Sequence, residues 1–152
     1  MNQAMMNELT TRRKGPAKVL AMLAIVGLTL GACTGTEETS NVTDLNEVRA
    51  HVGLSELVQV ADLNIKAEAQ AERMASRGTI FHSQNLAAGV GAGWSTIGEN
   101  VALAGSVSEA QIALEASPSH YANMTNPAYN QVGLGVVSRN GIVYVVQVFV
   151  GR

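Results

Sequence analysis

Residues 131–150 contain the strongest constraint on the fold, the dipeptide Asn140-Gly141 between two valine-rich runs. The runs, Gln131–Ser138 and Ile142–Val150, have the length and the β-branched content of strands. Asn-Gly favours the positive φ angles of a tight turn whose twist matches that of an antiparallel ribbon. The sequence therefore predicts a β-hairpin over these residues.

Earlier in the chain, apolar residues recur with the period of a helix from about residue 60 to residue 77. The apolar residues of this segment recur at offsets of 0, 4, 8 and 11, which places them on one helix face. Gly78 follows as a stop signal. We interpret the apolar face as core and not as a binding device; it comprises Leu63, Ala67, Ala71 and Met74.

Capping signals predict two further helices. One begins at Asp44, with Glu47 in position to complete the cap, and ends at Gly53. The other begins with the capping box formed by Ser106 and Glu109 and continues to about residue 116. Both signals place polar side chains where the first backbone N–H groups of a helix lack partners.

The remaining segments complete an α+β pattern. Ser117-Pro118 predicts another helix start, because proline suits the first helical position. Residues 79–98 lack a sustained period and predict a loop with a short strand near residues 80–83, and residues 100–103 predict a further strand. Helices followed by antiparallel strands favour an α+β domain.

Cys33, the single cysteine of the chain, ends the apolar run Val19–Ala32, which follows the basic group Arg12-Arg13-Lys14. The run is shorter than the ~20 residues that a helix needs to cross a bilayer core, and its basic flank is typical of a signal peptide. A signal that ends in small residues and a cysteine is the layout of a bacterial lipoprotein. We therefore expect removal of residues 1–32 and attachment of a diacylglycerol to Cys33.

This interpretation places the protein outside the cytoplasm, with the membrane as a partner through its lipid anchor. Residues 33–43 are rich in Thr, Glu and Ser and predict a lipidated cysteine followed by a flexible tether. Residues 44–152 then form one domain, long enough for a core without disulfides.

Composition argues against nucleic acid as a partner. From Cys33 onward the chain has six Lys and Arg residues against eleven Asp and Glu, a net charge of −5. Nucleic-acid binders carry a basic surface, and single-strand binders add aromatic stacking platforms. Aromatic residues make up only 4% of this chain.

Three titratable residues stand out as site candidates: His82, Glu99 and His120. Two imidazoles and a carboxylate can hold a divalent metal such as zinc, with one position open to water. They can equally form a general acid–base group, or be structural residues with separate partners. His51, at the end of the first predicted helix, suits the negative end of the helix dipole, and we interpret it as structural.

In chain order, these residues resemble the CAP superfamily of cysteine-rich secretory proteins, antigen 5 and pathogenesis-related 1 proteins. The resemblance spans residues 44–151, nearly the whole predicted domain. No single motif is specific, but their combination and order are. They are Leu45-Asn46, Arg49, Gly53-Leu54, Arg73-Met74-Ala75, Phe81-His82-Ser83, Ile97-Gly98-Glu99-Asn100-Val101-Ala102, Ser117-Pro118-Ser119-His120, Asn123-Met124, Val132-Gly133-Leu134-Gly135-Val136, Tyr144, Gln147 and Phe149.

The resemblance implies an α-β-α sandwich with a small antiparallel sheet of about three strands. It also implies a cleft tetrad of two histidines and two acidic residues that binds a divalent cation in several members. His82, Glu99 and His120 match three of its positions. The fourth, an acidic residue soon after the first histidine, has no counterpart among residues 84–87, Gln-Asn-Leu-Ala.

Two further positions depart from the pattern of relatives. Tyr121 stands where bacterial members often have arginine, and Leu114 where many members have tryptophan. These changes affect the rim of the cleft and therefore the ligand that it prefers.

Three functions follow from the sequence. The leading one is a non-enzymatic module that binds a lipid, a small molecule or an envelope or extracellular protein through the cleft. Ser83 and Ser119 adjoin the histidines, but consecutive side chains point apart, so neither predicts a nucleophile activated by its neighbour. The alternatives are a metal-assisted hydrolase of peptides or envelope polymers, with His82 and His120 as ligands and Glu99 as ligand or base, and a structural scaffold.

Overall fold

The computed structural model describes residues 34–152. The predicted signal peptide and Cys33 lie outside the described residues. The elements follow one another in the order α1 (Thr34–His51), β1 (Val58–Gln59), α2 (Ala61–Arg77), β2 (Thr96–Ala104), α3 (Val107–Ala116), α4 (Pro118–Met124), β3 (Gln131–Arg139) and β4 (Ile142–Gly151).

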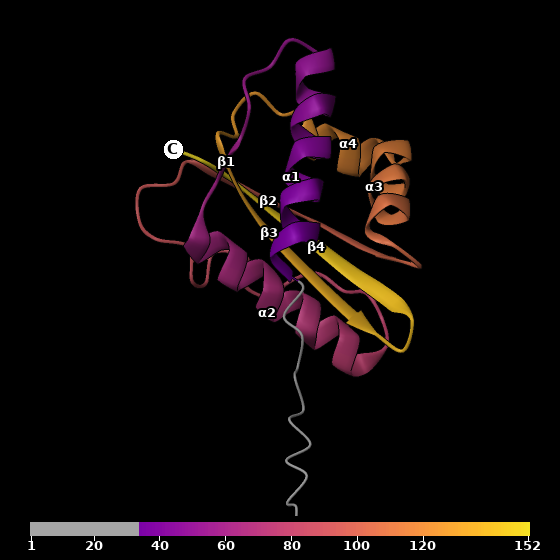
Figure 1. Cartoon of the computed structure of the whole chain (residues 1–152). Helices are drawn as coiled ribbons and strands as arrows, with labels where there is room; N and C mark the ends of the chain where they lie inside the picture. Colours follow the sequence, from indigo (N-terminus) through magenta and orange to yellow (C-terminus); the bar gives the residue numbers. More distant parts are fainter. Residues whose placement is uncertain (1–33) are drawn as a thin grey trace, which may run out of the picture. The chain divides into compact units, whose positions relative to one another are not determined.

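One sheet organises the domain, with the strand order β1-β3-β4-β2 (Figure 1). β4 pairs antiparallel with β3 on one side and with β2 on the other. β1 adds a parallel pair of only two residues to the outer edge of β3. The α+β sandwich is confirmed, and the sheet has four strands where the sequence predicted about three.

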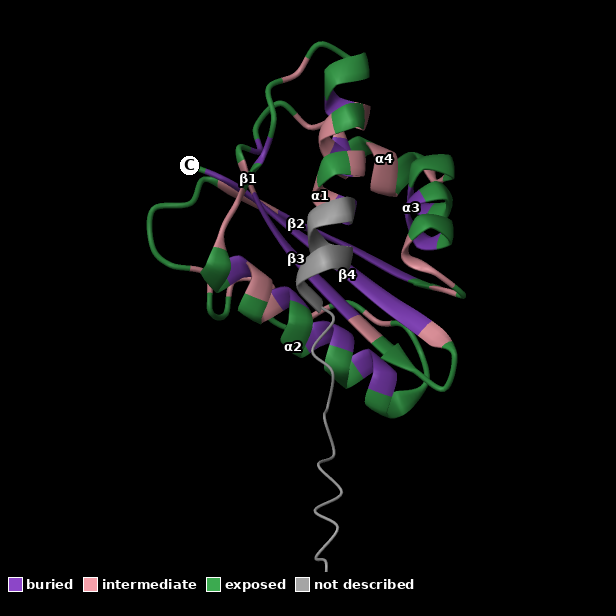
Figure 2. Ribbon diagram, viewed as in Figure 1, coloured by how far each residue is buried: buried purple, intermediate pink, exposed green. Residues whose placement is uncertain are grey.

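The two faces of the sheet carry separate cores. Val145 and Phe149 of β4 pack on the side of α1, α3 and α4, whereas Val146 and Val148 pack on the side of α2. Because successive side chains of a strand point to opposite faces, a strand covered on both sides reads as a continuous apolar run. β4 is such a strand, buried along nearly its whole length (Figure 2).

The start of the first helix differs from the prediction. α1 begins at Thr34, so the segment predicted as a flexible tether is helical, and Asp44 lies inside the helix and does not cap it. The reason is a contact that local sequence does not reveal. The Asn41 side chain is fully buried and hydrogen-bonds to Gln111 and Gln147, which fixes α1 before Asp44 is reached.

The end of α1 is held by a buried arginine. The Arg49 guanidinium donates hydrogen bonds to the carbonyl oxygens of Ser55, Met124, Asn126 and Tyr129, at 2.8 to 3.2 Å. One side chain therefore joins α1 to the end of α4 and to the loop before β3.

α2 and the late hairpin match their predictions. The predicted apolar face of α2 is buried, and Gly78 ends the helix with φ of 66°. In the hairpin turn, Asn140 and Gly141 have φ of 53° and 76°. The predicted loop lacks the strand near residues 80–83, and β2 begins at Thr96, four residues earlier than predicted.

The two short helices follow their capping signals. Ser106 Oγ accepts a hydrogen bond from the Glu109 backbone N–H at 3.2 Å, and the Glu109 carboxylate accepts one from the Gly105 N–H at 3.0 Å. Pro118 opens α4 as predicted. Within residues 34–152, no helix combines the length and the apolar character that crossing a membrane would require.

Glycines on β3 allow α2 to lie directly on the sheet. A Cβ atom at Gly133 would overlap the Leu63 backbone, and one at Gly135 would overlap the backbone of Ala67 and Glu68. The spacing of these glycines thus matches one turn of the helix above them.

We expect Gly135→Ala to destabilise the domain by roughly 1–3 kcal/mol, because the helix backbone must move away from the sheet to admit the methyl group. Chemical denaturation would measure the change. Gly91→Ala is the matched control, since a Cβ there meets only the Arg152 side chain, at 3.6 Å. Equal stability of the two variants would contradict the close approach.

Candidate functional site

The candidate residues gather around β2, the strand at one edge of the sheet. Glu99 lies on β2 itself, and His82 lies in the loop that connects α2 to β2. His120 lies in the first turn of α4, the helix that follows α3 on the opposite face. The three residues thus come from the α2 side of the sandwich, from the sheet and from the α4 side.

Glu99 is a buried carboxylate with three donors around it. Its Oε1 lies 2.9 Å from His82 Nδ1 and accepts a hydrogen bond from the Ser83 backbone N–H at 2.8 Å. Its Oε2 accepts one from the Ser83 hydroxyl at 2.5 Å. The Glu99 side chain is 2% exposed, whereas the His82 side chain is 60% exposed. Glu99 therefore orients, through Nδ1, an imidazole that is mostly exposed to solvent.

His120 is held through its backbone. Its carbonyl oxygen accepts a hydrogen bond from Asn100 Nδ2 at 3.1 Å, and Asn100 Oδ1 accepts one from Asn123 Nδ2 at 2.9 Å. Burial lowers the pKa of His120 below its ordinary value of 6.5, and the nearby His82 lowers it further. The structure thus brings His120 close enough to His82 for their charges to interact.

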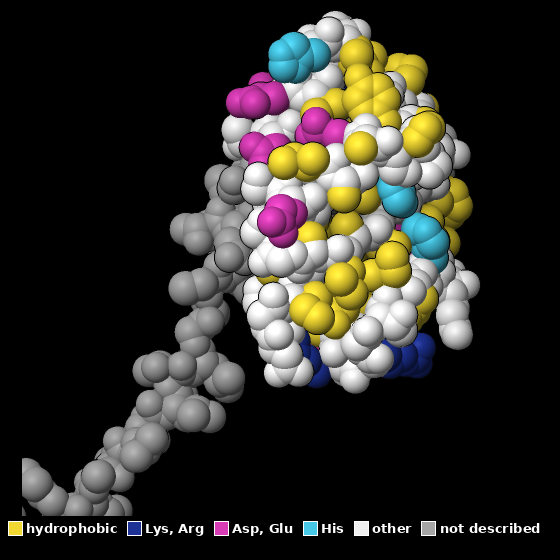
Figure 3. All heavy atoms as spheres, turned by 90° about the vertical axis from the view of Figure 1, so that its right-hand side faces the viewer, with side chains coloured by type: hydrophobic (Ala, Val, Ile, Leu, Met, Phe, Trp, Pro, Cys, Tyr) yellow, Lys and Arg dark blue, Asp and Glu magenta, His cyan; other side chains and the backbone are white. Residues whose placement is uncertain are grey.

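The surface view agrees with this arrangement. Figure 3 shows histidine side chains next to each other on one face of the domain and a further histidine side chain well apart from them. The chain has only three histidines. His82 and His120 thus form a pair near the surface, and His82 contacts the buried Glu99 directly.

The donor set fits a divalent metal only in part. Among the residues that the structure describes, no group of three or more His, Cys, Asp or Glu side chains is arranged to hold a metal ion. The oxygens of Glu99 are turned toward His82 Nδ1 and Ser83, not toward a point shared with His120. Two imidazoles remain as potential ligands, and a carboxylate behind a ligating histidine is a common outer partner of metal sites.

The structure corrects the expectation that Leu114 affects the rim of the cleft, because its side chain is only 1% exposed. Leu114 is buried in the core between α3 and the sheet, and Tyr121 packs against the same core. Gln84 and Asn85, which occupy positions where the resemblance implies an acid, are exposed.

A buried amide network behind the site was missed by the sequence reasoning. Asn100 Nδ2 donates to Gln147 Oε1 at 3.0 Å, and Gln147 Nε2 donates to Gln111 Oε1 at 2.9 Å. All three residues are at most 3% exposed. Gln147 could have indicated this network in the sequence, because it is a polar residue inside the valine-rich run of β4.

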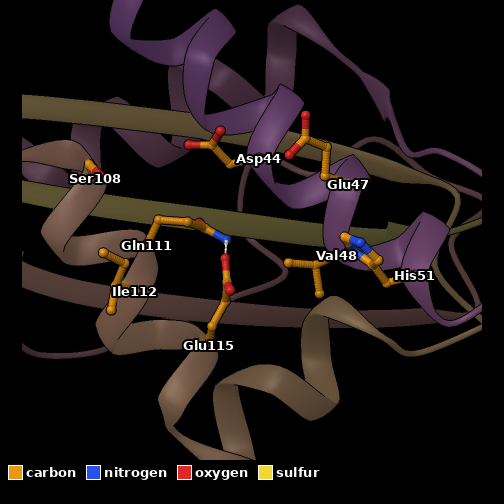
Figure 4. Close-up of a pocket in the computed structure, with 8 residues that line it drawn as sticks. All are labelled: Asp44, Glu47, Val48, His51, Ser108, Gln111, Ile112 and Glu115. Carbon is orange, nitrogen blue, oxygen red and sulfur yellow. Dashed lines mark hydrogen bonds between the residues drawn. The ribbon is translucent and has the colours of Figure 1, made fainter.

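His51 lies elsewhere, at the end of α1. It lines a groove between α1 and α3 together with Asp44, Glu47, Gln111 and Glu115 (Figure 4). Burial raises the pKa of Asp44, and the charges of Glu47 and Glu115 raise it further. His51 is thus separate from the pair of histidines beside Glu99.

The comparison with protein families agrees with the fold and the arrangement of the motifs. The model of the CAP family, the cysteine-rich secretory protein family, matches residues 42–149. The chain belongs to this family. No curated protein matches it closely in sequence.

Solved structures share the fold of this CAP domain. An outer surface protein from Borrelia burgdorferi superposes with a TM-score of 0.69 at 19% identity, over 78% of this chain and 95% of that one. A cysteine-rich secretory protein from Staphylococcus aureus gives 0.65 at 21% identity, over 77% of this chain and 38% of its own greater length. NaASP2, solved with Zn²⁺, gives 0.54 at 15% identity, over 74% and 78% of the two chains.

The lowered pKa of His120 predicts a pH-dependent stability. In the window between its folded-state pKa and 6.5, the unfolded chain binds more protons at this residue than the folded domain, so stability falls as the pH falls. We expect the melting temperature to drop as the pH falls through 6.5, the ordinary pKa of histidine, and to drop less steeply for His120→Gln. Ser119→Ala, a neighbouring change without a titrating group, should keep the wild-type slope. Identical slopes for wild type and His120→Gln would contradict the prediction.

Proposed function

We propose that this CAP domain is a ligand-binding module that works outside the cytoplasm, with the imidazoles of His82 and His120 as its polar contact groups. The observation that carries the proposal is the contrast between a buried, fully engaged Glu99 and the exposed His82 that it orients. A side chain held in place by a buried partner binds a ligand without losing much conformational freedom.

The hydrogen bonds around Glu99 favour binding over hydrolysis. A general base needs an oxygen within reach of the proton that it removes, and both oxygens of Glu99 already accept hydrogen bonds. The Ser83 hydroxyl donates to this carboxylate, and the Ser119 hydroxyl lies 3.4 Å from that of Ser117. Within residues 41–152, neither serine hydroxyl is hydrogen-bonded to an imidazole, the contact that activates a serine nucleophile.

Zinc is one ligand that this chemistry suits. His82 and His120 would supply imidazole nitrogens, while Glu99 would orient His82 through Nδ1 and stay outside the coordination sphere. The zinc recorded with NaASP2, a protein of the same fold, is in line with this proposal. Bound zinc would supply a Lewis acid to which a ligand oxygen or nitrogen can bind.

Native mass spectrometry of the purified protein, before and after zinc addition, tests the proposal. We expect a bound species in the wild type that is lost in His82→Ala and in His120→Ala, because each removes one contact group. His51→Ala removes the histidine outside the site and should keep the bound species. Equal occupancy in all four proteins, or no bound species in any of them, would refute binding through this pair.

We further propose that the domain is held at a membrane through Cys33, in line with the signal pattern before it. The bacterial relatives of similar fold include an outer surface protein and a secretory protein by name. A diacylglycerol on Cys33, one residue before α1, would keep the domain close to the leaflet.

Metabolic labelling with a radioactive fatty acid tests the anchor. We expect the label on the wild type and not on Cys33→Ser, because the chain has no other cysteine to receive it. The variant should also run as an uncleaved precursor or leave the membrane fraction. Equal labelling of both proteins would exclude Cys33 as the attachment point.

A further inference from the structure

A second cavity lies next to the histidine site and shares Ser83 with it. It has a volume of about 220 Å³ and lies between the C-terminal half of α2 and the loop that follows the helix. Amide and guanidinium groups dominate its lining, and none of the lining residues is acidic. Besides Ser83 they are Gln70, Arg73, Arg77, Phe81, Gln84 and Asn85.

The two arginines of this cavity are fixed by neutral partners. Arg73 donates to Gln70 Oε1 from Nε at 3.0 Å and from Nη2 at 2.7 Å. Gln70 is itself buried and donates to the Phe81 carbonyl oxygen at 2.5 Å, so its position is set. The Arg77 guanidinium lies 4.7 Å from the centre of the Phe81 ring, which it contacts as a cation–π pair.

Neither guanidinium has a carboxylate partner. On a helix surface, an arginine can form an ion pair with an acidic residue three or four positions away. Those positions hold Ala69, Gln70, Ser76 and Arg77 around Arg73, and Arg73 and Met74 before Arg77. In the part of the chain that the structure describes, the two ion pairs involve His82 and Arg139, so neither cavity arginine forms an ion pair.

The positive charge extends one turn further along the helix. Lys66, Gln70, Arg73 and Arg77 share one face of α2, at offsets of 0, 4, 7 and 11. Lys66 Nζ donates to the Ala88 carbonyl oxygen at 2.7 Å, in the same loop that borders the cavity. Burial lowers the pKa of Lys66; Glu99 acts to raise it, and the charge of Arg73 acts to lower it.

The helix dipole explains a cation at the end of α2 but not this arrangement. A single basic residue in the last turn satisfies the dipole, and Arg77 supplies it. A second arginine four residues earlier adds like-charge repulsion of the kind that destabilises helices.

From this geometry we infer that the cavity between α2 and the loop after it binds a phosphate group, with Arg73 and Arg77 as its cationic contacts. The planar guanidinium presents paired N–H donors that match the oxygens of a phosphate. Gln84 and Asn85 border the same space and add neutral amide groups. The phosphate offsets the repulsion between the two arginines. This inference goes beyond the proposed function, because it does not require the imidazoles.

Calorimetric titration of the full chain, extracted in detergent, with inorganic phosphate at constant ionic strength tests the inference. We expect saturable binding by the wild type and a loss of about tenfold or more in affinity for Arg73→Gln and for Arg77→Gln, since each removes a charge-assisted contact. Arg139→Gln removes the same charge outside the cavity and should bind like the wild type. Far-ultraviolet circular dichroism of each variant confirms that the fold is kept.

Two further ligands separate the sources of a phosphate group. Glycerol 3-phosphate represents a free phosphate ester, and dihexanoylphosphatidic acid represents a lipid headgroup. Tighter binding of one of them, dependent on both arginines, supports the inference and identifies the source. Absence of phosphate binding by the wild type, or equal affinity in wild type and both cavity variants, overturns it. Neither result bears on the histidine variants, so the proposed function is tested separately.

Discussion

A chain of buried side-chain amides holds the layers of this domain together. Gln147, on the central strand β4, accepts a hydrogen bond from Asn100 on β2 and donates to Gln111 on α3 and to Asn41 on α1. Asn123 on α4 completes the chain through Asn100. A buried amide without partners costs more than a satisfied one contributes, so these residues stabilise the fold only when all of them are in place. The network therefore links all three helices on one face of the sheet to the strands beneath them.

This network also sets the position of the candidate site. Asn100 points into the network and binds the His120 carbonyl oxygen, while its neighbour Glu99 points to the opposite face and binds His82. A strand that slipped by one residue would exchange the two faces, burying Glu99 among the amides and leaving both histidines without their partners. The pairing of Asn100 with Gln147 across β2 and β4 fixes the register and so excludes that exchange. Asn100, which belongs to the buried network, and Glu99, which belongs to the candidate site, are thus adjacent residues of β2.

The elements that could be predicted from sequence are those with local causes. The hairpin follows from Asn140-Gly141, and α2 follows from its apolar face and Gly78. The start of α1 could not be predicted, because it depends on a contact between Asn41 and a residue 106 positions away. Likewise, the family resemblance identified His82, Glu99 and His120 as a group, but only the folded chain places the Glu99 oxygens against Ser83. Long-range polar contacts leave no periodic pattern in the sequence.

The missing acid of the family tetrad and the unpaired arginines have a common physical basis. Gln84 and Asn85 occupy the stretch where the resemblance implies a carboxylate, and both line the cavity that contains Arg73 and Arg77. A carboxylate at either position would supply a counter-charge to the guanidinium groups and occupy the space between them. With neutral amides there, the negative charge of the site is confined to Glu99, which is buried and turned toward His82. The same substitution that leaves two imidazoles as potential metal ligands thus also leaves the neighbouring cavity lined by arginines and without an acidic residue, as the inferred phosphate site requires.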